Sequence, residues 1–225
     1  IAGDCAATPD MSAIVARKRK VTATLQTGLE KTAAQLKVRV VRGDAEFFGA
    51  GLVRVASVDG SLEIAGDRVI LATGSSPLEL PSLPVDHRLV LSSDDALELQ
   101  TVPEHLVVVG GGVIGCELAF IYRAFGAKVT VIEGQGRLLP LPSVDGEISR
   151  LLLREMKKKG IAVELARTVT ATTPTGTGVS VEIGASPFVE VANPPAPRTL
   201  EADAVCVTVG RVPHTDGLGL DAAGV

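Results

Sequence analysis

A glycine-rich segment constrains the fold of this chain more than any other feature. Residues 110–115 read Gly-Gly-Gly-Val-Ile-Gly and fit the pattern GxGxxG; an apolar run precedes them and a helical pattern follows. This pattern indicates dinucleotide binding when a strand leads into the loop and a helix leaves it. Gly110 then allows the tight turn, Gly112 lets a pyrophosphate approach the backbone, and Gly115 lets helix and strand pack closely. The phosphates would meet free N–H groups at the helix N-terminus, although an ordinary tight turn is the alternative for the loop by itself.

An acidic residue further along strengthens the nucleotide interpretation. Glu133 lies 18 residues after Gly115 and closes the next predicted strand, residues 128–133. A carboxylate at this place can accept hydrogen bonds from both hydroxyls of the adenosine ribose, and it repels a 2′-phosphate. Residues 134–136 supply no basic pair for such a phosphate, and Arg137 alone is a poor substitute. The sequence therefore predicts binding of NAD rather than NADP.

Two residues directly after the glycine loop allow more than one interpretation. Glu117 is either an acid favoured near a helix N-terminus or a residue that faces the nicotinamide. Its neighbour Cys116 is expected to be a small buried residue rather than a redox thiol. Cys206 lies within an apolar strand pattern and is expected in the core.

The part of the chain before the glycine loop changes its hydrophobic period once. Apolar residues recur at helical spacing over residues 10–36, with Asp10 as a candidate N-cap. Residues 38–72 instead predict a β-meander whose strands bury both faces. Four strands are expected in it, at residues 38–41, 52–55, 62–64 and 68–71. Residues 75–103 are interpreted as an extended connector with a helical turn, and as a candidate domain boundary.

The second part of the chain predicts a parallel sheet. Residues 106–109 form a continuous apolar run, which is typical of a strand covered on both faces. The further expected elements are a helix at 112–125, a strand at 128–133, a helix at 143–158, a strand at 161–164, and short strands within 168–209, the last at 204–209. The fold class is therefore α/β, with a Rossmann-like domain that combines a parallel sheet, helices and a β-meander.

Composition excludes several other functions. The chain has 225 residues, of which 46% are hydrophobic and 3% aromatic, so a globular fold with an aliphatic core is expected. The net charge of −4 argues against a general nucleic-acid surface, and no apolar run reaches the roughly 18 residues of a membrane helix. Cys5, Cys116 and Cys206 lie far apart, which favours a reduced, cytoplasmic protein. The histidines show no ligand spacing, so no metal site is expected.

Three ordered motifs resemble those of one known family. They are Ala72-Thr73-Gly74-Ser75-Ser76-Pro77, Gly110-Gly111-Gly112-Val113-Ile114-Gly115-Cys116-Glu117-Leu118-Ala119 and Gly210-Arg211-Val212-Pro213-His214-Thr215. Together they resemble the pyridine nucleotide-disulfide oxidoreductases, and within that family the dihydrolipoamide dehydrogenases. The resemblance covers nearly the whole chain. His214 stands where the family usually has Asn.

The resemblance implies a division into domains and a set of binding residues. Residues 1–92 resemble part of an FAD-binding domain, residues 93–213 an NAD-binding domain, and residues 214–225 the return to the FAD domain. The NAD loop is matched by Gly110, Gly111, Gly112, Val113, Ile114, Gly115, Cys116 and Glu117, with Glu117 beside the nicotinamide. Glu133 matches the ribose-binding acid, Val169 a contact on the adenine side, and Gly210 a glycine near the nucleotide. For FAD, the matching residues are Ala45, Thr73, Gly74 and Ser75.

The family's reaction passes electrons from dihydrolipoamide through a redox disulfide and FAD to NAD, and its partner is a lipoyl-bearing acyltransferase of a 2-oxo acid dehydrogenase complex. In the family, the first GxGxxG and the redox cysteine pair would precede residue 1, and the His-Glu base would follow residue 225. We therefore expect a piece of a homodimeric enzyme that is itself monomeric and inactive, with NAD binding retained and FAD binding weak or lost. The alternatives are a sister enzyme, such as a mercuric reductase or a pyridine nucleotide transhydrogenase, and a non-enzymatic nucleotide-binding module.

Overall fold

The computed structural model describes residues 9–225, which fall into two compact units. One unit contains the segment that ends at Arg17 together with Pro77–Arg211, and the other contains Lys18–Ser76 and Val212–Val225. Cys5 lies outside the described residues. Within residues 9–225, no helix has the length and apolar character needed to cross a membrane.

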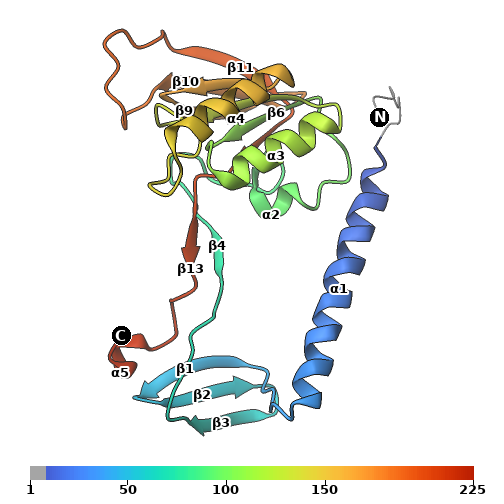
Figure 1. Cartoon of the computed structure of the whole chain (residues 1–225), viewed down its shortest axis with the longest axis vertical. Coiled ribbons are helices and arrows are strands. Elements are labelled where there is room, and N and C mark those ends of the chain that lie inside the picture. The colour runs from blue at the N-terminus through green and yellow to red at the C-terminus, as the bar shows by residue number, and fades with distance from the viewer. Residues whose placement is uncertain (1–8) are drawn as a thin grey trace. The chain divides into compact units, whose positions relative to one another are not determined.

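A five-stranded parallel sheet forms the centre of the first unit (Figure 1). Its strand order is β5-β12-β6-β7-β8, and every neighbouring pair is parallel. The strands span Val90–Ser92 (β5), Ala204–Val207 (β12), His105–Val109 (β6), Lys128–Glu133 (β7) and Ala162–Leu165 (β8). Because β12 comes from the end of this unit's sequence and enters between β5 and β6, the sheet joins segments that lie far apart along the chain.

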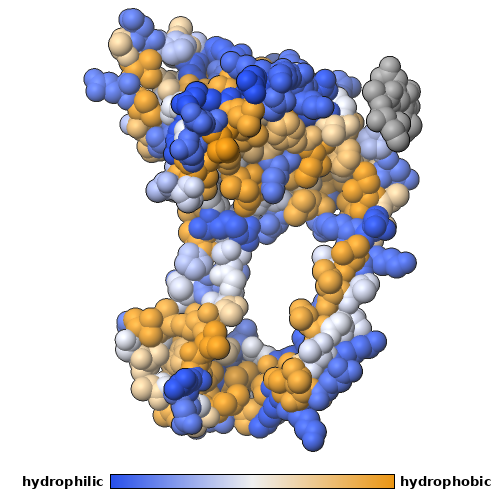
Figure 2. Space-filling view, viewed as in Figure 1, coloured by the Kyte–Doolittle hydropathy of each residue, from blue (hydrophilic) through white to orange (hydrophobic). Residues whose placement is uncertain are grey.

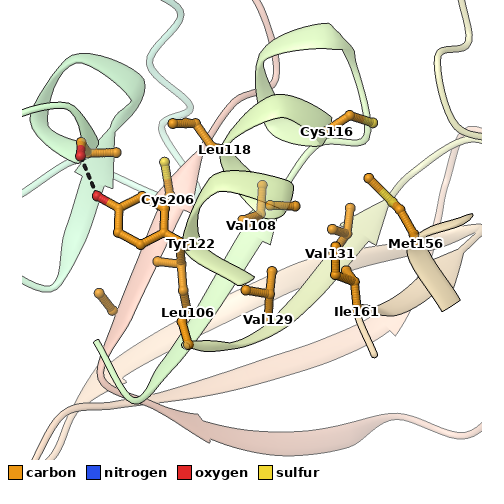
Figure 3. Close-up of a cluster of buried hydrophobic side chains, with 14 of the residues drawn as sticks. Leu106, Val108, Cys116, Leu118, Tyr122, Val129, Val131, Met156, Ile161 and Cys206 are labelled. Carbon is orange, nitrogen blue, oxygen red and sulfur yellow. Dashed lines mark hydrogen bonds between the residues drawn. The ribbon is translucent and has the colours of Figure 1, made fainter. Parts of the chain in front are cut away.

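Two other layers cover the faces of this sheet. Successive side chains of a strand point to opposite faces, and in β6 Leu106 and Val108 join one apolar cluster while Val107 and Val109 join another. The first cluster, part of which Figure 3 shows, packs against the helices α3 (Val113–Ala124) and α4 (Gly146–Lys158). The second packs against an antiparallel sheet of β11 (Arg198–Ala202), β10 (Val179–Ala185) and β9 (Arg167–Pro174). Burial of β6 on both faces confirms the interpretation of its apolar run.

A short helix closes the edge of the sheet beside β5. Helix α2 spans Ser93–Ala96 and begins with a capping box. In this box, the side chains of Ser92 and Asp95 each accept a hydrogen bond from the other residue's backbone N–H. The phenolic hydroxyl of Tyr122, from α3, donates to the Ala96 carbonyl in the buried cluster (Figure 3). Burial raises the pKa of Tyr122 to about 12. Strand β5 is fully buried, so this part of the predicted connector is built into the sheet.

The second unit is thinner and more exposed. The long helix α1 spans Met11–Gln35 and continues from the first unit into this one; the Asp10 carboxylate accepts from the Ala13 N–H, which confirms the predicted N-cap. Beyond it, β1 (Asp44–Gly49), β2 (Leu52–Ser57) and β3 (Gly60–Ala65) form an antiparallel sheet. The Phe47 N–H of β1 donates to the Leu218 carbonyl, and helix α5 (Leu220–Ala223) begins two residues after Leu218. The segments β4 (Ser75–Pro77) and β13 (Arg211–Pro213) pair as a two-stranded sheet.

Two of the predicted strands in this region are wrong. Residues 38–41 and 68–71 are irregular, whereas a strand that was not predicted forms at Asp44–Gly49. Both mispredicted runs are rich in β-branched residues, but neither pairs with a neighbouring strand, so propensity alone does not make them strands. Val38 and Ile70 are 56% and 90% exposed.

The prediction that the meander buries both faces is also wrong for the described residues. Within β1, β2 and β3 only Phe47 and Val55 are buried, and Figure 2 shows apolar surface over this sheet. Helix α1 likewise presents an apolar stripe along one side and charged residues along the other (Figure 2). Its large exposed apolar residues are Ile14, Val21, Leu25 and Leu29.

Candidate dinucleotide-binding site

The glycine loop connects β6 to α3 at the carboxyl end of the parallel sheet. Gly110 has φ of +108°, a conformation that favours glycine, and its N–H donates to the Ile132 carbonyl at 2.8 Å. A Cβ on Gly115 would lie 2.0 Å from the Gly110 oxygen and 2.6 Å from the Thr208 hydroxyl. A Cβ on Gly111 would lie 2.6 Å from a methyl carbon of Leu138. Glycine is therefore required by the backbone at Gly110 and Gly115, whereas at Gly111 a Cβ would crowd the side chains of Leu138 and Glu133.

Gly112 differs from the other glycines of the loop. It is the N-cap of α3 and has an ordinary φ of −72°. Because it has no side chain, it makes no side-chain hydrogen bond to the first N–H groups of the helix. Apart from its two neighbours in the chain, no described residue lies within 4 Å of a Cβ built at this position. The fold itself therefore leaves room for a side chain at Gly112, and the space lies at the end of a helix where N–H groups are available to an anion.

Glu133 ends strand β7 beside this loop and is 6% exposed. One carboxylate oxygen accepts from the Gly111 N–H at 2.5 Å, and the other accepts from the Gln135 N–H at 2.6 Å. The structure thus brings the acid and the loop together, as the spacing predicted. The sequence did not indicate that the carboxylate also fixes the backbone of both adjacent turns. Each oxygen of a carboxylate can accept more than one hydrogen bond, so capacity for a ligand hydroxyl is left.

The side chain of Arg137 is held by hydrogen bonds around the start of α4. Its guanidinium donates to the carbonyls of Val144 and Leu141, each at 2.9 Å, and to the hydroxyl of Ser149 at 3.3 Å. These bonds keep the charged group on the segment that precedes α4.

The first turn of α3 carries the other predicted residues of the loop. Val113 and Glu117 are both exposed and lie four residues apart, so they share one side of the helix. Ile114 is partly buried against the core, and Cys116 is 5% exposed with its sulfur 3.3 Å from the Gly111 oxygen. The prediction that Cys116 and Cys206 are buried core residues is confirmed (Figure 3).

Burial makes both of these thiols poor nucleophiles. It raises the pKa of Cys116 to about 11 and that of Cys206 to about 12. At pH 8 the thiolate fraction is then about one in a thousand or less, and thiolate is the reactive form. In native buffer, we expect iodoacetamide to leave Cys116 and Cys206 unmodified for hours, and in urea to modify both. Peptide mapping by mass spectrometry measures this, and rapid native labelling of either residue would contradict the burial.

The remaining predicted residues lie in different places. Val169 is in β9, 6% exposed, and packs in the apolar layer between the two sheets. Gly210 follows β12, has φ of +145°, and accepts at its carbonyl from the Leu78 N–H. Sequence reasoning missed Thr208, whose hydroxyl lies 2.9 Å and 3.0 Å from the carbonyl oxygens of Val109 and Gly110. Its position two residues before Gly210, after an apolar strand, is the only signal in the sequence.

The residues predicted for FAD all lie in the second unit. Ala45 is in β1, opposite Val55 of β2. The Thr73 hydroxyl donates to the His214 carbonyl at 2.7 Å, and the His214 N–H donates to the Gly74 carbonyl at 3.0 Å. Ser75 begins β4. The structure therefore brings residues 73–75 and the segment around His214 together, although they lie about 140 positions apart in the sequence.

A glycine loop after the central strand of a parallel sheet, a helix N-terminus beside it, and an acid at the end of the adjacent strand together define a Rossmann-type fold. Sequence comparison then identifies the family. The chain belongs to the pyridine nucleotide-disulphide oxidoreductases, which match it over residues 2–225. The resemblance drawn from the three motifs is thereby confirmed.

Several relatives are dihydrolipoyl dehydrogenases. The chain is 38% identical over 217 residues to dihydrolipoyl dehydrogenase 3 of Pseudomonas aeruginosa, which covers 96% of this chain and 45% of the relative. It is 37% identical to the dihydrolipoyl dehydrogenase of Geobacillus stearothermophilus, covering 97% of this chain and 44% of that protein.

Solved structures agree with this family. The crystal structure of LpdA from Mycobacterium tuberculosis superimposes with a TM-score of 0.82 at 29% identity, covering 97% of this chain and 46% of that one. The HOCl-induced flavoprotein disulfide reductase RclA of Escherichia coli superimposes with a TM-score of 0.79 at 28% identity, covering 97% and 47%. The chain thus spans less than half the length of each of these relatives.

Proposed function

We propose that this chain is the NAD-binding part, with some of the FAD-binding part, of a dihydrolipoamide dehydrogenase-like flavoprotein. The observation that carries the proposal is the open position at Gly112 beside the carboxylate of Glu133. Packing explains the other glycines of the loop without a ligand, whereas Gly112 is free of such constraint. In the proposed complex, the pyrophosphate lies against Gly112 and the α3 N-terminus, and Glu133 accepts from the adenosine ribose.

The proposed domains follow the family: an FAD-binding part at residues 1–92, the NAD-binding domain at residues 93–213, and the return to the FAD domain at residues 214–225. Glu117 and Val113 share the exposed side of α3 next to the loop, which supports a place for them beside the nicotinamide. Ala45, Thr73, Gly74 and Ser75 are proposed to contribute to the FAD site. When bound, FAD would accept electrons from a disulfide couple and pass a hydride to NAD.

The thiols of the proposed reaction are not those of the described residues. Both Cys116 and Cys206 are buried with raised pKa values, whereas a redox-active pair needs accessible thiols of low pKa. In the complete enzyme, the proposed reducing substrate is dihydrolipoamide carried on the acyltransferase of a 2-oxo acid dehydrogenase complex. The role proposed for this chain is to bind and orient the dinucleotide.

Titration with NADH and NADPH tests the nucleotide assignment. We expect saturable binding of NADH, followed by nicotinamide fluorescence, and at least tenfold weaker binding of NADPH. Glu133 offers a negative charge to a 2′-phosphate and Arg137 is held elsewhere, so both features favour NADH.

Two variants at Glu133 disturb the adjacent turns to different extents. Glu133→Ala leaves the Gly111 and Gln135 N–H groups without their acceptor, whereas Glu133→Gln keeps one acceptor oxygen and removes the charge. We expect Glu133→Gln to weaken NADH binding by about tenfold, because hydrogen bonds to charged groups contribute roughly 1.5–3 kcal/mol. Wild-type chain that binds neither nucleotide, or binds both equally, would contradict the proposal.

A further inference from the structure

A long loop lies beside the turn that follows Glu133. It joins β10 to β11 over residues 186–197. At its start, the Ser186 N–H donates to the Ala166 carbonyl at 3.0 Å, and the Ala166 N–H donates to the Gln135 carbonyl at 2.9 Å. The loop, the start of β9 and the turn after β7 are therefore linked by successive backbone hydrogen bonds.

Arg167 anchors the other end of this loop. Its side chain is only 3% exposed, and its guanidinium donates to the carbonyls of Pro195, Ala196 and Ile183 at 2.6, 3.1 and 3.1 Å. Its Nε lies 3.7 Å from a carboxylate oxygen of Glu164. A buried guanidinium needs such partners, and here they include the loop's own backbone. The loop is consequently held at both ends.

Phe188 projects from the fixed start of the loop. Its N–H donates to the Ser186 hydroxyl at 3.1 Å, yet the residue is 67% exposed. The ring edge lies against Gly134, since a Cβ there would be 2.9 Å from a ring carbon. Gly134 directly follows Glu133. The chain has few aromatic residues, and this one lies, largely exposed, against the residue that directly follows the acid proposed to bind the ribose.

We propose that Phe188 stacks on the adenine of the bound dinucleotide. The inference rests on the proposed function, because it takes the adenosine ribose to lie on Glu133. The base attached to that ribose then lies near the turn at Gly134, next to the ring. Bases stack well on aromatic rings. Replacing such a ring with alanine removes a substantial part of the protein's affinity for the stacked nucleotide. The absence of a Cβ at Gly134 leaves the ring free to approach that turn.

Calorimetric titration with NADH and ADP-ribose tests this placement, because ADP-ribose carries the adenine without the nicotinamide. We expect Phe188→Ala and Phe188→Leu to weaken binding of both ligands by about tenfold. Phe188→Tyr keeps the ring and should bind within about twofold of the wild type. All three variants should keep the wild-type unfolding midpoint, since the residue is largely exposed.

Proton NMR of ADP-ribose supplies a readout that a purely structural role would not change. Stacking on Phe188 should shift the adenine H2 and H8 resonances upfield in the wild type and Phe188→Tyr, and much less in Phe188→Leu. If the wild type binds NADH and the Ala and Leu variants bind as tightly with the same shifts, the stacking inference is wrong and the proposed function stands. If the wild type binds neither ligand, the proposed function fails and this inference fails with it.

Discussion

Gly115→Ala is expected to lower the free energy of unfolding of the first unit by about 3 kcal/mol or more, at the upper end of what overpacking costs. The added methyl group would lie 2.0 Å from a backbone oxygen of Gly110 and 2.6 Å from the hydroxyl of Thr208. The first atom belongs to the backbone, and hydrogen bonds to the carbonyls of Val109 and Gly110 hold the second, so α3 must move away from β6. Because a domain has only about 5–15 kcal/mol of stability in total, a large part of it would be lost.

Urea denaturation followed by circular dichroism measures this loss. Gly176→Ala is the matched control, because no described atom lies within 4 Å of a Cβ at Gly176 and its φ lies outside the range that favours glycine. The control should unfold within about 1 kcal/mol of the wild type. A Gly115→Ala chain that is as stable as this control would show that the helix and the strand are not packed as closely as described.

Gly112→Ala is expected to have the opposite profile: a nearly unchanged fold and a large loss of NADH binding. The position is open and has an ordinary φ, so the stability cost should be no more than about 1 kcal/mol, the cost of alanine at an N-cap. The methyl group would occupy the space proposed for the pyrophosphate. Losing one or two hydrogen bonds from backbone N–H groups to a charged phosphate corresponds to a decrease in affinity of about 100-fold.

Fluorescence titration with NADH measures that decrease, with Gly176→Ala again as the control for introducing a methyl group at an open glycine. The two glycine variants thus separate folding from binding within one loop. If Gly112→Ala bound NADH like the wild type, the pyrophosphate would have to lie elsewhere, and the proposed function would lose its main support.

The glycine loop and Glu133 could be predicted from the sequence because their geometry is local. A strand, a loop of fixed glycine spacing, a helix and an acid lie within about 30 consecutive residues, and each follows from backbone rules. Strand β6 could be predicted for the same reason, since a run of aliphatic residues without polar alternation is buried on both faces. The long helix and its N-cap at Asp10 also follow from a local periodicity.

Features that depend on distant partners could not be predicted. Strand β5 has only three residues and exists because β12, more than 100 positions later, pairs with it. The runs at 38–41 and 68–71 have strand propensity but no partner. In the site, nothing local shows that Arg167 holds the far end of a loop, or that Phe188 lies against Gly134.

The position of β12 has a consequence for the order in which this chain can fold during synthesis. Ala204 of β12 lies opposite Leu106 of β6, so a strand inside the sheet is made 98 residues after its neighbour. Until it emerges from the ribosome, β5 and β6 cannot be joined, and both carry unpaired backbone edges. Pairings of such sequence separation close large loops and slow folding. Exposed strand edges attract chaperones or other nascent chains in the interval, so the unit should become resistant to protease only after β12 has been translated.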